Sequence, residues 1–188
     1  MSRIALLDAC VLYPADIRDF LVRVVMTDAY HARWTERIHD EWIRNLLMNR
    51  TDLTKEQLNR TRRLMNLHVR DCLVEDYEHF IESLVLPDPD DRHVLAAAIR
   101  AQADVIVTTN LKDFPTDVLS QHRIIALHPD KFVCQLMDSQ SGLVCSAARL
   151  QRASLKNPVK SVVEFLSGLE QSGLPQTVLR LQAFADLL

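Results

Sequence analysis

Residues 3–8 read Arg-Ile-Ala-Leu-Leu-Asp, a short apolar run that ends at a carboxylate. Residues 105–110, Val-Ile-Val-Thr-Thr-Asn, show the same arrangement, and residues 124–127 form a third short apolar run. Such runs, bounded by polar residues, are typical of strands buried on both faces of a parallel sheet. Residues that follow neighbouring parallel strands meet at one edge of the sheet, where ligands bind. We therefore expect the polar groups after these runs to gather at that edge.

The segments between these runs have helical periodicity. Apolar residues recur at helical spacing over residues 14–26, 35–48, 54–69, 77–84, 90–102 and 115–121. Strands alternating with helices predict an α/β fold, a central parallel sheet with helices on both faces. From Pro129 the pattern is helical alone, over residues 129–137, 142–156, 159–169 and 175–188. We predict an α/β domain over residues 1–137 and an all-helical C-terminal extension over residues 138–188.

The composition is that of a folded chain. Its 188 residues carry 22 Lys and Arg against 25 Asp and Glu, 48% are hydrophobic, and there are only 3 Gly and 7 Pro. These values exclude a disordered or collagen-like chain. No apolar run approaches the ~18 residues of a membrane-spanning helix. The four cysteines lack CxxC spacing and no signal-peptide pattern opens the chain, so we expect a reduced, cytoplasmic protein.

Charge is distributed unevenly along the chain. Residues 33–70 hold nine Lys and Arg against five Asp and Glu, whereas residues 71–91 hold eight acids and no Lys or Arg. Residues 139–163 hold four basic residues and no acid. Charge runs are usually solvated faces. An acidic cluster beside basic surface also suits a polyanion whose phosphates must be brought to a metal ion.

Three acidic residues occupy positions where a functional role competes with a structural one. Asp8 would cost several kcal/mol if buried unpaired, so it needs a partner or a metal, unless it caps the following turn. Asp113 follows a buried run, and its alternative is the N-cap of a helix entering at Pro115. Glu41 shares a helical stripe with Asn45, and its alternative is a solvated helix edge.

A fourth acid, Asp91, lies in a helix-start signal. In Asp88-Pro89-Asp90-Asp91, Asp88 is a good N-cap, Pro89 suits the first turn, and acids are favoured by the helix dipole. A helical wheel places Asp91 on the apolar face and Asp90 mostly opposite. That apolar face is formed by Val94, Leu95 and Ile99. We therefore expect Asp91 to point inward and Asp90 outward.

These residues carry a family resemblance. Residues 8–14 (Asp-Ala-Cys-Val-Leu-Tyr-Pro), 40–42 (Asp-Glu-Trp), 88–98 (Asp-Pro-Asp-Asp-Arg-His-Val-Leu-Ala-Ala-Ala) and 108–114 resemble, in order, the motifs of PIN-domain nucleases. The resemblance is strongest to VapC-type toxin ribonucleases of bacterial toxin–antitoxin systems and covers about residues 1–135. The remaining residues resemble the helical C-terminal extension of one VapC-like subgroup.

The resemblance implies a site and an activity. It implies a catalytic acidic site of Asp8, Glu41, Asp91 and Asp113, supported by Thr108 and Asn110, in which Asp8, Asp91 and Asp113 bind the metal. It also implies an endoribonuclease that leaves 5′-phosphate and 3′-hydroxyl ends. This chain departs from the family pattern at Cys10, where many relatives have a hydroxyl or amide, and at Asn110, where some have a carboxylate.

Carboxylate oxygens are hard ligands, and a site without His or Cys selects Mg²⁺ or Mn²⁺ over zinc. The resemblance implies an RNA substrate, a cognate antitoxin that silences the enzyme, and a homodimer. A catalytically weak PIN-like module that binds RNA or protein is the alternative function, and a DNA-processing nuclease is a third. No paired-histidine metal motif or phosphate-binding glycine loop competes with these hypotheses.

Overall fold

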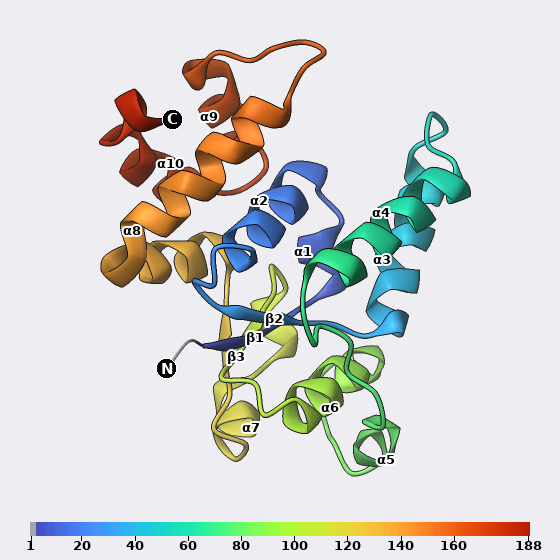
Figure 1. Cartoon of the computed structure of the whole chain (residues 1–188). Helices are drawn as coiled ribbons and strands as arrows, with labels where there is room; N and C mark the ends of the chain where they lie inside the picture. Colours follow the sequence, from blue (N-terminus) through green and yellow to red (C-terminus); the bar gives the residue numbers. More distant parts are fainter. Residues whose placement is uncertain (1–2) are drawn as a thin grey trace.

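The computed structural model describes residues 3–188, with a four-stranded parallel sheet at the centre (Figure 1). The strands are β1 (Ile4–Leu7), β2 (His31–Arg33), β3 (Val105–Val107) and β4 (Ile125–Leu127), in the order β2-β1-β3-β4. Leu7 of β1 pairs with Val107 of β3, which pairs with Leu127 of β4. The sheet therefore aligns the carboxyl ends of β1, β3 and β4.

The sequence predicts three of these strands and misses β2. Its residues, His31, Ala32 and Arg33, include a single buried side chain, that of Ala32. Pairing with β1, in which Ala32 lies opposite Ala5, makes this edge segment a strand. Local hydrophobic periodicity carries no signal for such a short edge strand.

Seven helices and two 3₁₀ turns precede Pro129 in the described part of the chain. They are α1 (Ala9–Leu12), α2 (Ala15–Val25), α3 (Glu36–Asn49), α4 (Lys55–His68), α5 (Glu78–Ile81), η1 (Pro89–Asp91), α6 (Arg92–Arg100), η2 (Leu111–Asp113) and α7 (Thr116–Ser120). The sequence does not predict α1, and α5 is shorter than the helix predicted over residues 77–84. Helix boundaries are otherwise close to those predicted.

Helices cover both faces of the sheet, as predicted (Figure 1). On one face α2 contacts β2 and the long helix that follows β4, and on the other α6 contacts β1 and β3. α7 packs against β4. The buried side chains form a single hydrophobic cluster whose largest members are Trp34, Trp42, Tyr30, Phe20 and Phe132. This core confirms the predicted α/β architecture.

The C-terminal region is all-helical, as predicted. It consists of α8 (Pro129–Ser154), α9 (Val162–Gln171), α10 (Pro175–Gln182) and a final 3₁₀ turn, η3 (Ala185–Leu187). At Gln140, inside α8, the backbone leaves helical geometry (φ −141°, ψ 37°), within the interval where the sequence predicts a break. The predicted domain boundary at residues 137 and 138 stays a prediction. Among residues 3–188 no helix combines the length and apolar character required to cross a membrane.

Buried polar contacts fix α3 in place. The Thr35 side chain caps the helix by accepting from Ile38 N at 3.0 Å. Farther along, His39 Nδ1 accepts from Trp42 Nε1, and its Nε2 lies 3.0 Å from Asn66 Oδ1 of α4. His39 is therefore part of the packing of α3 against α4. This packing sets the position of the α3 side chains that face the carboxyl edge of the sheet.

Candidate metal centre

Asp8 follows β1 directly and is buried at the carboxyl edge of the sheet. Because β1 pairs with β3, Thr108 lies beside it, and the Thr108 hydroxyl donates to Asp8 Oδ2 at 2.7 Å. Ala9 N donates to Asp8 Oδ1 at 2.6 Å, so Asp8 also caps α1. Asp8 therefore both caps a helix, which is the alternative raised from the sequence, and lies at the end of a strand.

Cys10 keeps a hydrogen bond at the position where many relatives have a hydroxyl or amide. Its thiol donates to Asp8 Oδ2 at 3.1 Å, and its sulfur accepts from Thr109 N at 3.3 Å. Burial, and then the negative charge of Asp8, raise the pKa of the Cys10 thiol to about 11. The residue is therefore a neutral donor to Asp8 at neutral pH.

Asp91 and Asp88 come from the turn that opens α6. Asp88 caps this turn, with its Oδ1 accepting from Asp90 N at 2.9 Å. Asp90 is exposed, whereas Asp91 is half-buried and lines a pocket, as the helical wheel predicts. The Oδ2 atom of Asp91 is buried and has no hydrogen-bond donor among the described residues. Such an uncompensated carboxylate oxygen calls for a ligand.

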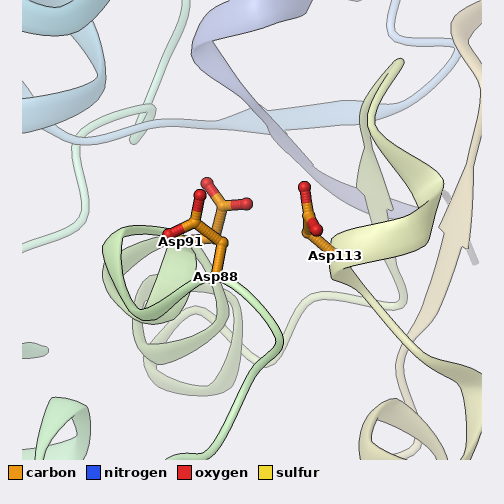
Figure 2. Close-up of side chains that lie close together, drawn as sticks. All are labelled: Asp88, Asp91 and Asp113. Atoms are coloured by element: carbon orange, nitrogen blue, oxygen red, sulfur yellow. The ribbon is translucent and has the colours of Figure 1, made fainter.

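The pKa of Asp91 is raised because its carboxylate is partly buried and other acids lie close to it. Burial, followed by the charges of Asp8, Asp88 and Asp113, raises the pKa of Asp91 from 3.8 to about 6. One carboxylate oxygen each of Asp88, Asp91 and Asp113 lies within 4.8 Å of the other two (Figure 2). In Figure 2 the three carboxylates point into one space between the start of α6 and η2.

Asp113 is buried in η2, just past β3. The Asn110 side-chain amide donates to the Asp113 carboxylate, and Asn110 N donates to Thr108 Oγ1 at 3.0 Å. The next helix, α7, begins at Thr116. Its N-cap residue is Pro115, and no side chain forms a capping hydrogen bond there. The alternative that Asp113 caps that helix is therefore wrong. Asn110, which replaces a carboxylate of some relatives, orients Asp113 instead.

Glu41 faces the aspartates from α3. It lines a pocket of about 380 Å³ together with Asp8, Asp91 and Asn110. The Nε2 atom of buried His93 lies 2.9 Å from Glu41 Oε1 without an aligned hydrogen bond, and Arg37 Nε lies 3.5 Å from the same oxygen. Burial alone would raise the pKa of Glu41, but His93 and Arg37 outweigh burial and lower it. Glu41 is therefore ionised at neutral pH.

The structure thus brings the sequence-predicted residues to one place. Around the pocket, or directly behind it, lie Asp8, Glu41, Asp91, Thr108, Asn110 and Asp113. From the sequence, Asp88 is predicted only as a helix cap, and nothing indicates that His93 is a neighbour of Glu41. The sequence around Asp88 is a local signal for a helix cap. Only the approach of η2 to α6 shows that Asp88 also lies close to Asp113. We call this 380 Å³ cavity the acidic pocket.

The donor set fits a hard divalent cation. Among the described residues, the lining of the acidic pocket holds three carboxylates and three asparagine side chains, without Lys, Arg or His. Oxygen ligands of this kind suit Mg²⁺ or Mn²⁺. The free oxygen of Asp91 and the mutual repulsion of the acids are the features that a cation would compensate.

Comparisons with known proteins relate the chain to two families. Residues 5–112 match the PIN domain family, and residues 129–183 match the VapC50 C-terminal domain family. Over 48 residues the chain is 62% identical to a Mycobacterium tuberculosis protein named "Putative ribonuclease VapC50". That stretch covers 26% of this chain and 28% of that protein. No solved structure matches the chain.

The match to the PIN domain family includes β1, β3 and the segments that carry Asp8, Glu41 and Asp91. The second covers most of the helical region after β4. Both matches agree with the resemblance seen in the sequence motifs. The match to the PIN domain family spans more than half of the residues of this chain. The chain therefore belongs to the PIN-domain family and carries the C-terminal extension of its VapC-like members.

Proposed function

We propose that this chain is a metal-dependent endoribonuclease of the VapC toxin type, which hydrolyses RNA phosphodiester bonds at the acidic pocket. The observation that carries the proposal is the convergence of Asp88, Asp91 and Asp113 within 4.8 Å, with Asp8 close enough to raise the pKa of Asp91. PIN-family membership and the ribonuclease name of the mycobacterial relative support it. A cluster of uncompensated acids costs stability, which a function in cation binding explains.

Asp8, Asp91 and Asp113 are the proposed ligands of Mg²⁺ or Mn²⁺, and the position of Asp88 makes it a further candidate ligand. When bound, the ion supplies Lewis acidity, which polarises a phosphodiester and lowers the pKa of water. Asp91 Oδ2 has no competing donor among residues 3–188 and is free for this task.

Residues behind the ligands hold them in orientation. Thr108 donates to Asp8, and Asn110 donates to Asp113, so each carboxylate is held in a fixed orientation. Supporting hydrogen bonds of this kind typically affect metal affinity or activity about 10- to 100-fold. Thr108 and Asn110 are therefore proposed as positioning residues.

Glu41 is proposed to orient the attacking water and to accept its proton. It lines the acidic pocket together with Asp8 and Asp91, and its lowered pKa keeps it ionised at neutral pH. A general base must be ionised before the reaction, and Glu41 meets this requirement. The products proposed are 5′-phosphate and 3′-hydroxyl ends.

The proposed partners are an RNA substrate and a cognate antitoxin protein that covers the acidic pocket. The VapC50-type region after β4 and its basic segment, residues 139–163, are proposed to contact RNA or the antitoxin. A homodimer is proposed by resemblance to other PIN-domain proteins. We also propose that the protein is located in the cytoplasm.

Cleavage of structured RNAs by wild type and Asp8→Asn in the presence of Mn²⁺ tests the proposed function. We expect wild-type cleavage that stops in EDTA, and a loss of about 100-fold or more in Asp8→Asn, because a neutral amide is a poor ligand for a hard cation. Asp90→Asn, which changes an exposed acid on the same turn, is the matched control and should retain activity.

Equal cleavage by wild type and Asp8→Asn, or cleavage by neither, would contradict the proposal and favour the binding-module alternative. Single-stranded DNA of the same sequence, assayed in parallel, separates a ribonuclease from a DNA-processing nuclease. Preference for DNA would overturn the assignment of RNA as substrate.

A further inference from the structure

A second pocket adjoins the acidic pocket, and the two share Tyr13. This pocket has a volume of about 290 Å³ and lies among the C-terminal side of α1, the start of α2 and the facing sides of α3 and α4. Its lining includes Arg18 and Arg50 and no aspartate or glutamate. We call it the basic pocket. Because Tyr13 lines both pockets, they are neighbours, and we call the two together the path; it has acids in one pocket and two arginines in the other.

The cation of the basic pocket that lacks an acidic partner is Arg18. Its Nη1 atom donates to the carbonyl oxygens of Leu12 and Tyr13 at 2.5 and 3.2 Å, and its guanidinium lies 4.6 Å from the centre of the Trp42 ring. Among residues 3–188 no carboxylate forms an ion pair with it. Arg50, by contrast, pairs with Asp52 through two hydrogen bonds.

A partly buried guanidinium fixed by carbonyls and an aromatic ring is a preorganised anion site. Burial lowers the pKa of Arg18 to about 10, which leaves the side chain charged at neutral pH. Arginine matches the geometry of a phosphate group, and its planar group loses little freedom when it is already held. The charge of Arg18 is therefore available to an anion that enters the basic pocket.

The acidic pocket also carries side chains suited to a nucleobase. Glu41, Asn45 and Asn49 are spaced by four residues along α3, and all three line the acidic pocket. Asn49 donates to the carbonyl of Asn45, whereas the Asn45 side chain and the Tyr13 hydroxyl make no hydrogen bond within the described chain. An aromatic ring thus lies near a free amide, with acids at one end and a cation at the other.

We propose that this path binds single-stranded RNA, with the base next to the scissile phosphate stacked on Tyr13 and its edge hydrogen-bonded by Asn45. The following phosphate pairs with Arg18, while the scissile phosphate lies at the acidic pocket. This inference rests on the proposed ribonuclease function and assigns Tyr13 and Asn45 as specificity-determining residues. Only an unpaired base can leave its neighbours to stack on a protein ring, so the substrate must be unpaired there.

The test combines a protein variant with a change in the RNA. A single-stranded RNA that wild type cleaves at a mapped position is made with an abasic ribose at either nucleotide flanking that position. Wild type, Tyr13→Leu and Tyr13→Phe are compared on the intact and abasic RNAs by their KM and kcat. Tyr13→Phe keeps the ring, and Tyr13→Leu keeps an apolar side chain without it.

With intact RNA, Tyr13→Leu should raise KM about 5- to 30-fold, and Tyr13→Phe should match wild type, because stacking needs the ring. On the RNA abasic at the contacted nucleotide, wild type should lose both the stacking and the Asn45 hydrogen bond, whereas Tyr13→Leu should lose only the smaller contribution of Asn45. A structural role for Tyr13 would penalise both RNAs equally. Annealing the RNA to its complement should abolish cleavage by all three proteins.

Asn45→Ala should raise KM about two- to tenfold, with a change in preference for the stacked base, since one hydrogen bond to a base edge is lost. Asn59→Ala on α4, which lines neither pocket, is its matched control. The two hypotheses fail separately. If wild type cleaves no RNA, the proposed function fails. If wild type cleaves but Tyr13→Leu shows the same KM and the same abasic penalty, the RNA path is wrong and the groove is left to a protein partner.

Discussion

Replacing Asp91 by asparagine should stabilise the metal-free protein. Burial and the nearby charges of Asp8, Asp88 and Asp113 raise the pKa of Asp91 to about 6, so its ionised form is disfavoured in the folded state. An acid with a raised folded-state pKa stabilises the fold when protonated, below its unfolded value of 3.8, and that stability is lost as the pH rises through about 6. Asparagine keeps the shape and removes the charge.

The expected gain follows from the size of this pKa difference. A change from 3.8 to about 6 corresponds to at most about 3 kcal/mol at neutral pH. Because Asp91 is only half-buried, solvent screening reduces the gain to about 1 kcal/mol. For a chain of 188 residues this shifts Tm upward by roughly 2–4 °C. The gain should be absent below the unfolded pKa and complete above the folded one.

Thermal and urea unfolding in EDTA, followed by circular dichroism, measure this difference. Asp90→Asn is the control, because it removes an exposed acid from the same helix start and carries the same loss of interaction with the helix dipole. In Mn²⁺ at about 100 times Kd, wild type should gain about 2.7 kcal/mol, and Asp91→Asn clearly less.

Two results would refute this reasoning. In EDTA, Asp91→Asn could unfold at the same temperature as Asp90→Asn or at a lower one, which would show that the acids do not repel one another. Alternatively, Mn²⁺ could raise the Tm of both variants equally. That outcome would place the bound ion away from Asp91.

Two further predictions concern buried polar groups outside the pocket. Burial lowers the pKa of His39, whose Nδ1 accepts from Trp42, so the free energy of unfolding should fall as the pH drops below 6.5. Urea unfolding should show a weaker fall in His39→Gln, and an equal fall would contradict the role of His39. Asp130→Ala should cost about 2–4 kcal/mol in urea unfolding, because it leaves the Gln176 and Thr177 N–H groups without an acceptor at the start of α10. The exposed first-turn acid Asp117, changed to Ala, is its control and should cost less than about 1 kcal/mol.

Much of the fold could be predicted because its signals are local. The buried strands β1 and β3 announce themselves as apolar runs, and the polar residues after them mark the edge of the sheet. The interpretation of Asp88 as a cap needs only the side-chain preference of the N-cap position, and that of Asp91 as inward-facing needs only helical periodicity. The three-residue edge strand β2 lacks such a signal, because its conformation is set by pairing with β1.

The sequence by itself determined the type of each element and the chemistry available to it, since periodicity and side-chain preference act within a few residues. Only the tertiary structure decided which groups meet. A carboxylate oxygen of Asp88 comes within 4.8 Å of one of Asp113 because η2 approaches the start of α6, and Tyr13 lines the same pocket as Asn45 because α1 packs against α3. Such contacts depend on the register of strands and the packing of helices far apart in the chain, which no local pattern encodes.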